Sequence, residues 1–352
     1  LVIREVRDES ATTKTFILAA DRDSGTNELA YFRAGQYLSL KVEVDGTPIT
    51  RPYSIASAPY ECLGGDGYYQ VTMKQVPDGF LTPYVWDNWG VGTKIESSGP
   101  CGSFHYEPLR DTRRIVGLAG GSGITPFLSM AREIAHGGLD AELLLLYGSS
   151  DEDDIVFYEE LKELEASAPA KLKIVHVLSC KEVTLEGCEQ GFITAETIQK
   201  YADLGESTFF VCGPQAMYEF VAKELATLRL PRRRMRWELS GLVKDVAQAA
   251  GFPPGQADQT YQLTVHIGGV TAQVPAKASE TVLVAMERAN LSPPSQCRSG
   301  ECGFCRSLLL SGDAYVYPDG DGRRAADKQL GYIHPCSSYP LTDLELAVAG
   351  GG

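Results

Sequence analysis

Short alternations of apolar and polar residues fill the first part of the chain and predict β-strands. Clear examples are residues 15–18, 37–42 and 69–73, and glycine, proline and aspartate residues separate these segments. Such alternation places side chains on opposite faces of a half-buried strand. Residues 1–107 are therefore expected to form an antiparallel β-barrel or sandwich.

From about Pro108 the pattern changes, because continuous apolar segments now alternate with helix-like ones. The expected strands cover residues 114–118, 143–147, 173–177 and 208–211. Uninterrupted apolar runs of this length are typical of parallel strands that helices cover on both faces. Residues 108–238 are therefore predicted to form an α/β domain with a parallel sheet.

A third region follows. Residues 239–258 are rich in glycine and proline and are expected to be a linker with a short helix near 243–250. Beyond them, two alternating segments flank the Gly-Gly pair at 268–269, which is a strong hairpin signal. A helix is expected over residues 281–289, and residues 259–352 are predicted to form a separate domain.

The charge of the chain excludes two classes of partner. With 46 acidic against 32 basic residues, the formal net charge is -14, which repels nucleic-acid phosphates and anionic membrane surfaces. The apolar runs are far shorter than the roughly 18 residues that a membrane span needs, and the start lacks a signal-peptide layout. The sequence therefore predicts a soluble, globular, cytoplasmic protein with no membrane span.

The nine cysteines are unevenly distributed. Five are scattered singly through residues 1–257, which is not the pattern of a disulfide framework. The other four have the spacing of plant-type [2Fe-2S] ligands, and they are Cys297, Cys302, Cys305 and Cys336. Four cysteines also bind zinc, but structural zinc usually uses paired short spacings, whereas four residues separate the first pair here. The spacing therefore favours the cluster.

Small residues between the first three cysteines suit a cluster loop. Ser299, Gly300 and Gly303 let thiolates and backbone N–H groups turn inward, and such donors stabilise anionic sulfurs. The segment 297–305 resembles the cluster loop of plant-type ferredoxin domains. The resemblance covers about the last 95 residues and implies a β-grasp fold. His334 stands where the family usually has an apolar residue, and we expect a neighbour of the cluster rather than a ligand.

Residues 51–57 combine a cation, an aromatic ring and two hydroxyls at the end of a predicted strand. Arg51 can neutralise a pyrophosphate, Tyr53 can cover one face of an isoalloxazine, and Ser54 can hydrogen-bond the flavin edge. A strand-end turn without any ligand explains this segment equally well when it is taken alone. Residues 79–82 add backbone amides and a hydroxyl that can approach a dinucleotide.

Two further turns follow strands of the predicted parallel sheet. Residues 118–126 are glycine-rich and precede a helix expected over 127–134, and a glycine-rich turn at a helix N-terminus is a natural pyrophosphate site. The spacing is not the GxGxxG fingerprint. Cys212 and Gly213 stand where the last expected strand reaches the carboxyl edge of the sheet, at which ligands bind.

Taken in this order, the segments resemble the ferredoxin-NADP reductase superfamily over roughly residues 1–238. The resemblance implies a flavin-binding barrel followed by a pyridine-nucleotide domain. It assigns to the flavin Arg51, Pro52, Tyr53, Ser54, Gly79, Leu81 and Thr82. It assigns to the nicotinamide cofactor Gly120, Gly121, Ser122, Gly123, Thr125, Cys212, Gly213 and Pro214. Ser54, Thr125 and Cys212 are expected at the place of hydride transfer.

Two segments bear on the choice of cofactor. The Gly-Pro-x-Gly element at residues 99–102 favours FAD over FMN, because related FMN reductases lack that form. After the second strand of the nucleotide domain, residues 151–154 are all acidic and would repel the 2'-phosphate of NADPH, so NADH is expected. A solvated acidic loop or first helical turn is the alternative interpretation of the same run.

The domain order is similar to that of reductase components of multicomponent oxygenases, phenylacetyl-CoA epoxidase reductase and hybrid cluster protein reductase. A nicotinamide delivers two electrons together and a [2Fe-2S] cluster accepts one, so a flavin is needed between them. We expect electrons to pass from NADH to FAD, to the cluster and then to an external protein acceptor. The alternatives are an electron-transfer subunit or activator for an anaerobic enzyme or corrinoid protein, and an iron-sulfur redox sensor. The sequence decides neither the acceptor nor the role of Trp237 and Glu238.

Overall fold

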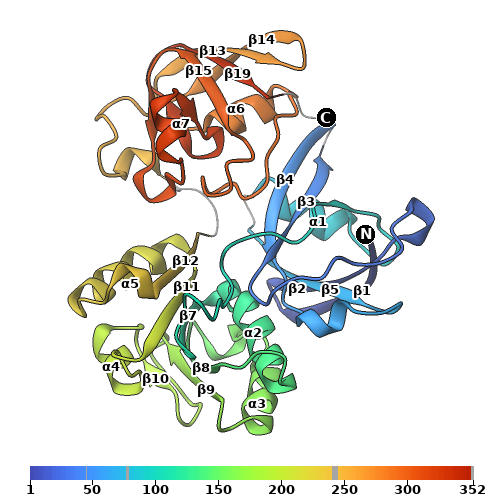
Figure 1. The fold of residues 1–352 in the computed structure, drawn as a ribbon, viewed down its shortest axis with the longest axis vertical. Helices are drawn as coiled ribbons and strands as arrows, with labels where there is room; N and C mark the ends of the chain where they lie inside the picture. Colours follow the sequence, from blue (N-terminus) through green and yellow to red (C-terminus); the bar gives the residue numbers. More distant parts are fainter. Residues whose placement is uncertain (45, 77–78, 240–244, 350–352) are drawn as a thin grey trace. The chain divides into compact units, whose positions relative to one another are not determined.

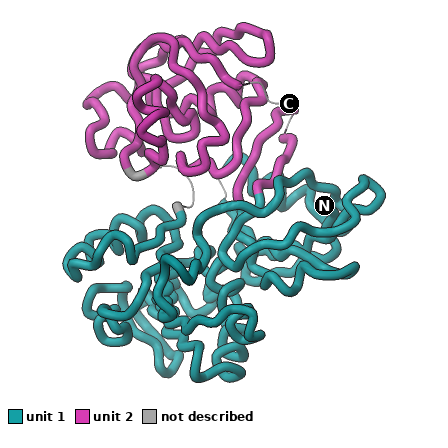
Figure 2. Tube along the Cα trace, in the orientation of Figure 1, with its two compact units in different colours: residues 1–38, 53–240 teal, residues 39–52, 241–352 magenta. Residues whose placement is uncertain are grey.

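The computed structural model of the chain describes residues 1–44, 46–76, 79–239 and 245–349. These residues group into two compact units, which Figure 2 shows in different colours. Unit 1 contains residues 1–38 and 53–240, and unit 2 contains residues 39–52 and 241–352. No helix within the described ranges is long and apolar enough to cross a membrane.

The N-terminal region forms two small sheets of three strands each (Figure 1). The first has the order β1 (Val2–Ser10), β2 (Thr13–Ala19), β5 (Tyr68–Lys74), and the second β4 (Thr47–Ser54), β3 (Tyr37–Val44), β6 (Glu96–Ser97). Strand β2 pairs antiparallel with β1 and β5, and a bridge between Ile55 and Val71 links the end of β4 to β5. Helix α1 (Thr82–Asn88) and the 3-10 turns η1 (Arg22–Ser24) and η2 (Pro59–Cys62) connect the strands. The expected antiparallel barrel is confirmed.

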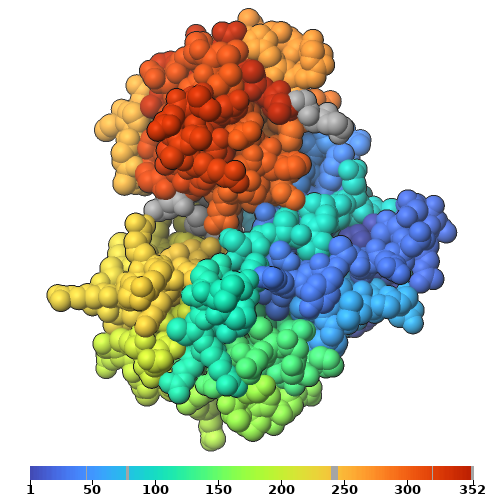
Figure 3. Space-filling view, viewed as in Figure 1, coloured from blue at the N-terminus to red at the C-terminus, as the bar shows by residue number. Residues whose placement is uncertain are grey.

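The central region contains a parallel sheet of six strands. Its order is β10 (Glu189–Gln190), β9 (Leu172–Leu178), β8 (Glu142–Ser149), β7 (Arg114–Gly120), β11 (Ser207–Gly213), β12 (Met235–Leu239). The four strands expected from the sequence are confirmed, and β10 and β12 extend the sheet at its edges. The space-filling view shows the region that contains this sheet in green to yellow (Figure 3).

Apolar side chains cover both faces of this sheet. Neighbouring residues of one strand enter different buried clusters: Phe210 packs in the cluster with Phe127 of α2, and Phe209 packs in the cluster with Val221 of α5. Alternate residues of a strand point to opposite faces, so a continuous apolar run is what two covered faces require. The helices are α2 (Thr125–His136), α3 (Tyr158–Ser167), α4 (Ala195–Tyr201) and α5 (Gln215–Thr227).

The strand order places a crevice between β7 and β11. From β7 the chain runs through β8 to β9 in one direction, and β11 then pairs with β7 from the other side. Such a reversal separates the two loops that leave the carboxyl ends of neighbouring strands, and ligands of open α/β sheets bind there. The loops at this point are the 3-10 turn η3 (Gly121–Ile124) and the segment that begins at Cys212.

The C-terminal region of unit 2 is a mixed sheet packed against a helix. The sheet order is β14 (Val270–Lys277), β13 (Thr260–Ile267), β19 (Leu344–Val348), β15 (Ser307–Ser311), β17 (Tyr332–Ile333), and β16 (Ala314–Val316) pairs with β18 (Ser338–Pro340). The hairpin closes between Ile267 and Val270, as the Gly-Gly pair predicts. Helix α6 (Val282–Arg288) begins where the Thr281 hydroxyl accepts a hydrogen bond from Val284 N–H, and α7 (Ala325–Gln329) follows β16.

The expected helix near residues 243–250 is wrong in extent. A single 3-10 turn, η6 (Val246–Gln248), is present in the described part of this segment, and residues 240–244 lie outside the described residues. Gly251, with a φ of 82°, and Pro253 follow closely, and both residue types end helices. The expected C-terminal β-grasp fold is confirmed.

Candidate functional site

The turn after β7 packs directly on the end of β11. A Cβ on Gly123 would lie 2.4 Å from the Cys212 carbonyl oxygen, and a Cβ on Gly120 would lie 2.2 Å from the Met217 sulfur. Because the Cys212 carbonyl belongs to the backbone and cannot move aside, only glycine at position 123 allows the turn to reach the strand end, whereas the flexible Met217 side chain could shift away from position 120. The glycine-rich turn and the segment at Cys212 thus meet at the carboxyl ends of β7 and β11.

Side chains below the turn hold its backbone. The Tyr147 hydroxyl donates a hydrogen bond of 3.1 Å to the Gly121 carbonyl. Burial raises the pKa of Tyr147, so this hydroxyl keeps its proton and remains a donor. The Thr125 hydroxyl donates to the Ser122 carbonyl at 3.1 Å. Thr125 therefore stabilises the turn itself, and its expected role at the nicotinamide stays a prediction.

One carboxylate joins the flavin motif to the parallel sheet within unit 1. The Ser54 hydroxyl, at the end of β4, donates to Glu238 Oε2 at 3.1 Å. The Cys212 thiol, on β11, lies 3.4 Å from the same oxygen. Ser54 and Cys212 were both expected at the hydride-transfer site, and the structure brings them to a common partner.

Glu238 is the residue that the sequence analysis left undecided. It lies on β12, opposite Cys212 in the parallel register of β11 and β12. The next residue back, Trp237, points to the other face, where its ring lies 4.8 Å from that of Tyr218. The segment 235–239 alternates apolar and polar residues, so a strand signal was present. Its arginines and its position before the linker obscured that signal.

Arg51 and Thr82, which are also assigned to the flavin, make hydrogen bonds to nearby backbone groups. The Arg51 guanidinium is half-buried and donates to the Thr50 carbonyl at 2.9 Å. The Thr82 hydroxyl accepts from Val76 N–H at 2.9 Å and donates to the Val76 carbonyl at 3.0 Å. Thr82 thus closes the turn before α1, and its expected contact with flavin phosphates stays a prediction.

Helix α2 also ties the flavin motif to the nucleotide turn. The buried guanidinium of Arg132 donates to the Ala56 carbonyl at 3.1 Å and to Gln70 Oε1 at 2.9 Å. One turn earlier, the Ser129 hydroxyl donates to the Ser57 carbonyl at 2.6 Å. Because α2 begins directly after the glycine turn, these bonds fix the strand end that carries Ser54 relative to that turn.

Carboxylates complete the Arg132 network. Its guanidinium also lies 3.3 Å from Glu61 Oε2 and 2.5 Å from Glu160 Oε1. A buried guanidinium that is surrounded by acceptors is stable only while all of them are present. This network therefore packs α2 against residues 56–70 within unit 1.

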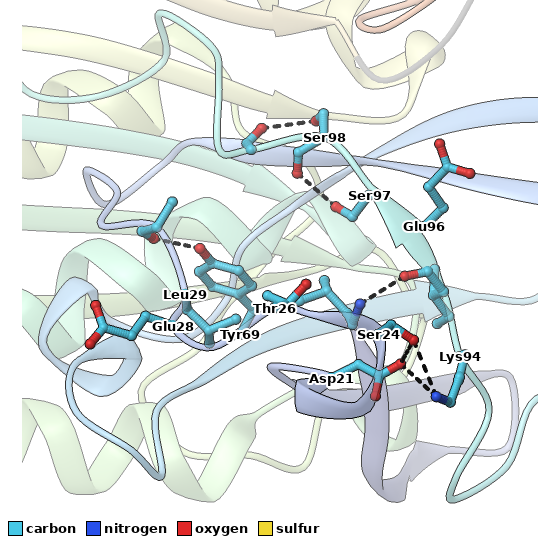
Figure 4. A pocket seen from close by; sticks show the side chains of 14 residues that line it. Asp21, Ser24, Thr26, Glu28, Leu29, Tyr69, Lys94, Glu96, Ser97 and Ser98 are labelled. Carbon is cyan, nitrogen blue, oxygen red and sulfur yellow. Dashed lines mark hydrogen bonds and ion pairs between the residues drawn. The ribbon is translucent and has the colours of Figure 1, made fainter.

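A cavity opens on the barrel, and Gly99, the first residue of the Gly-Pro-x-Gly element, is among the residues that line it. Its volume is ≈ 460 Å³, and residues from 21–30 and 94–99 line it together with Tyr69 (Figure 4). Asp21 pairs there with Lys94 at 2.9 Å. Hydrogen bonds from Ser24 and Lys94 lower the pKa of Asp21 to about 2. Lys94 and Asp21 thus satisfy each other.

In unit 2, the four expected cluster ligands lie together without forming a disulfide. The sulfurs of Cys305 and Cys336 are 3.4 Å apart. Hydrogen bonds from the Cys302 and Cys336 thiols lower the pKa of the Cys297 thiol, which favours the thiolate form that binds iron. Within the described ranges, no three His, Cys, Asp or Glu side chains surround a single point at metal-ligand distance. A [2Fe-2S] cluster instead takes two cysteines at each of its two irons.

Backbone N–H groups of the loop point at these sulfurs. Four such contacts of 3.3–3.4 Å come from Ser299 and Cys302 to Cys297, from Gly300 to Cys336 and from Phe304 to Cys302. An anionic cluster needs donors of this kind. The donor set and the amides therefore fit a [2Fe-2S] cluster.

A buried ion pair anchors this loop to α6. The Arg298 guanidinium binds the Glu287 carboxylate with two contacts of 2.5 Å and 3.0 Å, and both side chains are almost fully buried. Two parallel contacts to one carboxylate fix orientation as well as distance. The first residue after Cys297 is thereby held in place.

Comparison with known proteins agrees with this geometry. Three family models match the chain: an oxidoreductase FAD-binding domain over residues 1–106, an oxidoreductase NAD-binding domain over 118–223 and a 2Fe-2S iron-sulfur cluster binding domain over 265–341. The ferredoxin reductase component of 3-ketosteroid-9-alpha-monooxygenase from Rhodococcus rhodochrous is 29% identical over 350 residues, which cover 97% of this chain and 94% of that protein. The glycine betaine monooxygenase reductase subunit of Chromohalobacter salexigens is 26% identical over 352 residues, which cover 97% and 93%.

A solved structure shares the complete fold. Phthalate dioxygenase reductase, described as a modular structure for electron transfer from pyridine nucleotides to [2Fe-2S], has a TM-score of 0.68 and 24% identity. The superposition covers 99% of this chain and 97% of that one. The three domain matches and their order show that this chain contains an oxidoreductase FAD-binding domain, an oxidoreductase NAD-binding domain and a C-terminal 2Fe-2S iron-sulfur cluster binding domain, and its fold is that of phthalate dioxygenase reductase.

Proposed function

We propose that the protein passes electrons from NADH through FAD and a [2Fe-2S] cluster to a separate acceptor protein, as the reductase component of an oxygenase system. The observation that carries the proposal is the convergence of Ser54 and Cys212 on Glu238. A flavin motif and a nucleotide-domain strand have no structural need to share a polar contact there. A hydride-transfer site needs groups from both.

The cofactors supply the redox chemistry and the protein orients them. When bound, FAD accepts two electrons with the hydride of the nicotinamide and releases them singly to the cluster. Glu238 holds the Ser54 hydroxyl and the Cys212 thiol in fixed directions at the flavin edge. The hydroxyl lies 3.1 Å from the carboxylate, so a proton can move between these two groups. The glycine turn, held by Tyr147, binds the pyrophosphate and so sets how far the nicotinamide reaches.

The preference for NADH is part of the proposal and rests on residues 151–154. Glu152 accepts hydrogen bonds from the Thr184 and Leu185 amides, and Asp154 pairs with Lys74 at 2.5 Å. These two carboxylates therefore also stabilise the loop, as the alternative interpretation of the acidic run requires. The carboxylate of Asp151 is exposed at the end of β8, and it is the group that we expect to repel a 2'-phosphate.

FAD, rather than FMN, is proposed from the Gly-Pro-x-Gly element at residues 99–102 and the FAD-binding domain match. The flavin released by heat denaturation should co-elute with FAD on reversed-phase chromatography. A flavin that elutes as FMN would contradict this assignment and leave the electron route intact.

The decisive experiment is an anaerobic titration of the purified protein with NADH and then NADPH. The flavin band and the broader cluster absorption are followed separately, with cytochrome c reduction as the test of onward transfer. We expect NADH to bleach both chromophores and cytochrome c to be reduced continuously. Bleaching of the flavin alone with no turnover would favour the redox-sensor alternative, and absence of flavin would refute the reductase.

An oxygenase as acceptor is proposed because the relatives described above are named as reductase components of monooxygenases. Affinity capture with the cluster-loaded protein should recover an oxygenase that the reduced protein then supplies with electrons. A stably bound dehydrogenase or corrinoid protein in its place would support the electron-transfer-subunit alternative.

The proposal keeps the domain boundaries expected from the sequence, with a barrel to residue 107, a nucleotide domain over 108–238, a linker over 239–258 and a ferredoxin domain to 352. Limited proteolysis followed by mass spectrometry should cut first within the linker.

A cytoplasmic location is also expected, and cell fractionation tests it.

A further inference from the structure

His334 lies under the cluster loop without being a ligand. Its side chain is 2% exposed, and its Nδ1 lies 2.6 Å from the Gly300 carbonyl oxygen. A carbonyl only accepts, so Nδ1 carries the hydrogen and donates it. At the other end of the ring, Nε2 lies 3.4 Å from where a Cβ on Gly303 would stand. The ring thus spans the loop from Gly300 to Gly303.

Gly300 is the residue on which this contact acts. Its φ is 81°, and a Cβ would lie 1.7 Å from the Gly320 carbonyl oxygen, so only glycine fits. Glycine is also the residue with the greatest backbone freedom. Its N–H points at the Cys336 sulfur at 3.3 Å and its carbonyl points at His334. The histidine therefore restrains the one residue that directs an amide at the distant ligand.

The other ring nitrogen makes the polar side chain costly at this position. The Nε2 atom is buried and has no hydrogen-bond partner among the described residues, and such a group costs free energy. An apolar side chain, which ferredoxin domains of the family that this region resembles usually have here, would fill the space without that cost. The hydrogen bond from Nδ1 to the Gly300 carbonyl, the one that the ring makes to a described residue, offsets this cost.

We propose that His334 is a positioning residue for the [2Fe-2S] cluster: its bond to the Gly300 carbonyl holds the loop amides on the ligand sulfurs and so raises the reduction potential of the cluster. Reduction adds a negative charge to the cluster, and N–H dipoles aimed at the sulfurs stabilise that charge. A loop that is free to rotate at Gly300 loses part of this stabilisation. The inference rests on the proposed function only in requiring a cluster in this loop.

Two substitutions of equal shape isolate the hydrogen bond. In His334→Asn the side-chain amide takes the place of Nδ1 and keeps the donor, whereas His334→Leu has the same branching and no donor. The reduction potential of the cluster is measured in the full-length, cofactor-loaded protein by anaerobic spectroelectrochemistry, with the flavin as internal reference. The electron paramagnetic resonance spectrum of the reduced cluster reports its geometry.

We expect His334→Leu to decrease the ratio of reduced to oxidised cluster about tenfold when the ratio of reduced to oxidised flavin is held constant. This decrease corresponds to a reduction potential that is lower by ~59 mV for one electron. The Asn variant should remain close to the wild type in potential and spectrum. A Leu variant with the wild-type potential, or an Asn variant shifted as far as Leu, would overturn the proposal.

A further pair covers the case in which the Leu variant fails to assemble. His334→Gln places its donor at the position of Nε2 and not of Nδ1. The reduction potential of the cluster should therefore change in the Gln variant and stay unchanged in the Asn variant. Equal behaviour of Asn and Gln would also overturn the proposal. A wild-type protein without any cluster refutes the proposed function, whereas an intact cluster with unchanged potentials refutes only the role of His334.

Discussion

The loop of the expected cluster ligands and the proposed hydride-transfer site are built in opposite ways. Three of the four ligand cysteines lie within one nine-residue segment, and the amides that face their sulfurs belong to the same segment. The site at the end of β11 takes Ser54, Cys212 and Glu238 from three separate strands. A locally encoded site depends on its own residues. A site assembled by the fold depends also on the contacts that hold the strands in register.

The largest effect is expected from the removal of one of the four expected ligand cysteines. Cys336→Ser should abolish the cluster and cytochrome c reduction, because an iron needs both of its thiolates, while NADH still reduces the flavin. The measurements are cluster absorbance, iron content, cytochrome c reduction and flavin reduction by NADH. Cys180→Ser, in a loop of the nucleotide domain, is the matched control and should leave all four unchanged. Retention of the cluster in Cys336→Ser would mean that another residue is the fourth ligand.

The next largest effect should come from the network that joins α2 to the barrel. Arg132→Met removes the buried cation of Glu61 and Glu160, whose carboxylates are partly buried, and should lower the free energy of unfolding of unit 1 by about 3 kcal/mol. Urea unfolding followed by flavin fluorescence measures it, while cluster absorbance reports unit 2. Arg233→Met, at an exposed arginine, should have almost no effect. A loss of cluster at the same urea concentration would show that the two sites are not independent.

The contribution of Glu238 to the assembled site is expected to be slightly smaller. Glu238→Ala frees the Ser54 hydroxyl and the Cys212 thiol and should slow flavin reduction by NADH about a hundredfold, the usual result of misplacing reacting groups. Stopped-flow measurement with NADH and 4-deuterated NADH should show an increased isotope effect with unchanged NADH affinity. Glu238→Gln keeps an acceptor oxygen, so it should slow flavin reduction by NADH less than Glu238→Ala does. Glu206→Ala, at an exposed position, is the control.

The smallest effect concerns the choice between NADH and NADPH. Asp151→Arg should move the ratio of kcat/KM values toward NADPH about tenfold, or ~1.4 kcal/mol, through the reversed charge near the 2'-phosphate. Asp153→Arg makes the same charge change two residues further along and should shift the ratio less. Equal shifts would indicate a general effect of charge rather than a position that recognises the ribose.

The parts of the molecule differ in how far the sequence predicted them. The strands of both sheets and the hairpin at residues 260–277 follow from apolar patterns and from glycine turns. The expected cluster ligands follow from cysteine spacing, since three of them lie within nine residues and Cys336 completes the set. The sequence pattern did not predict strand β12, because its alternation covers only five residues and follows a run of arginines. The helix expected before residue 250 is a single 3-10 turn in its described part.

The sequence alone therefore determined the order of the three domains, the cysteine spacing that suits a cluster and the turns that suit a flavin and a nicotinamide. Only the tertiary structure decided that Glu238 links Ser54 to Cys212, that Arg132 joins α2 to Ala56, and that the His334 ring meets the Gly300 carbonyl. The reason is physical. A motif specifies chemistry over a few residues, whereas the partners of a side chain depend on strand order and register, which arise only when distant segments bury their apolar faces together.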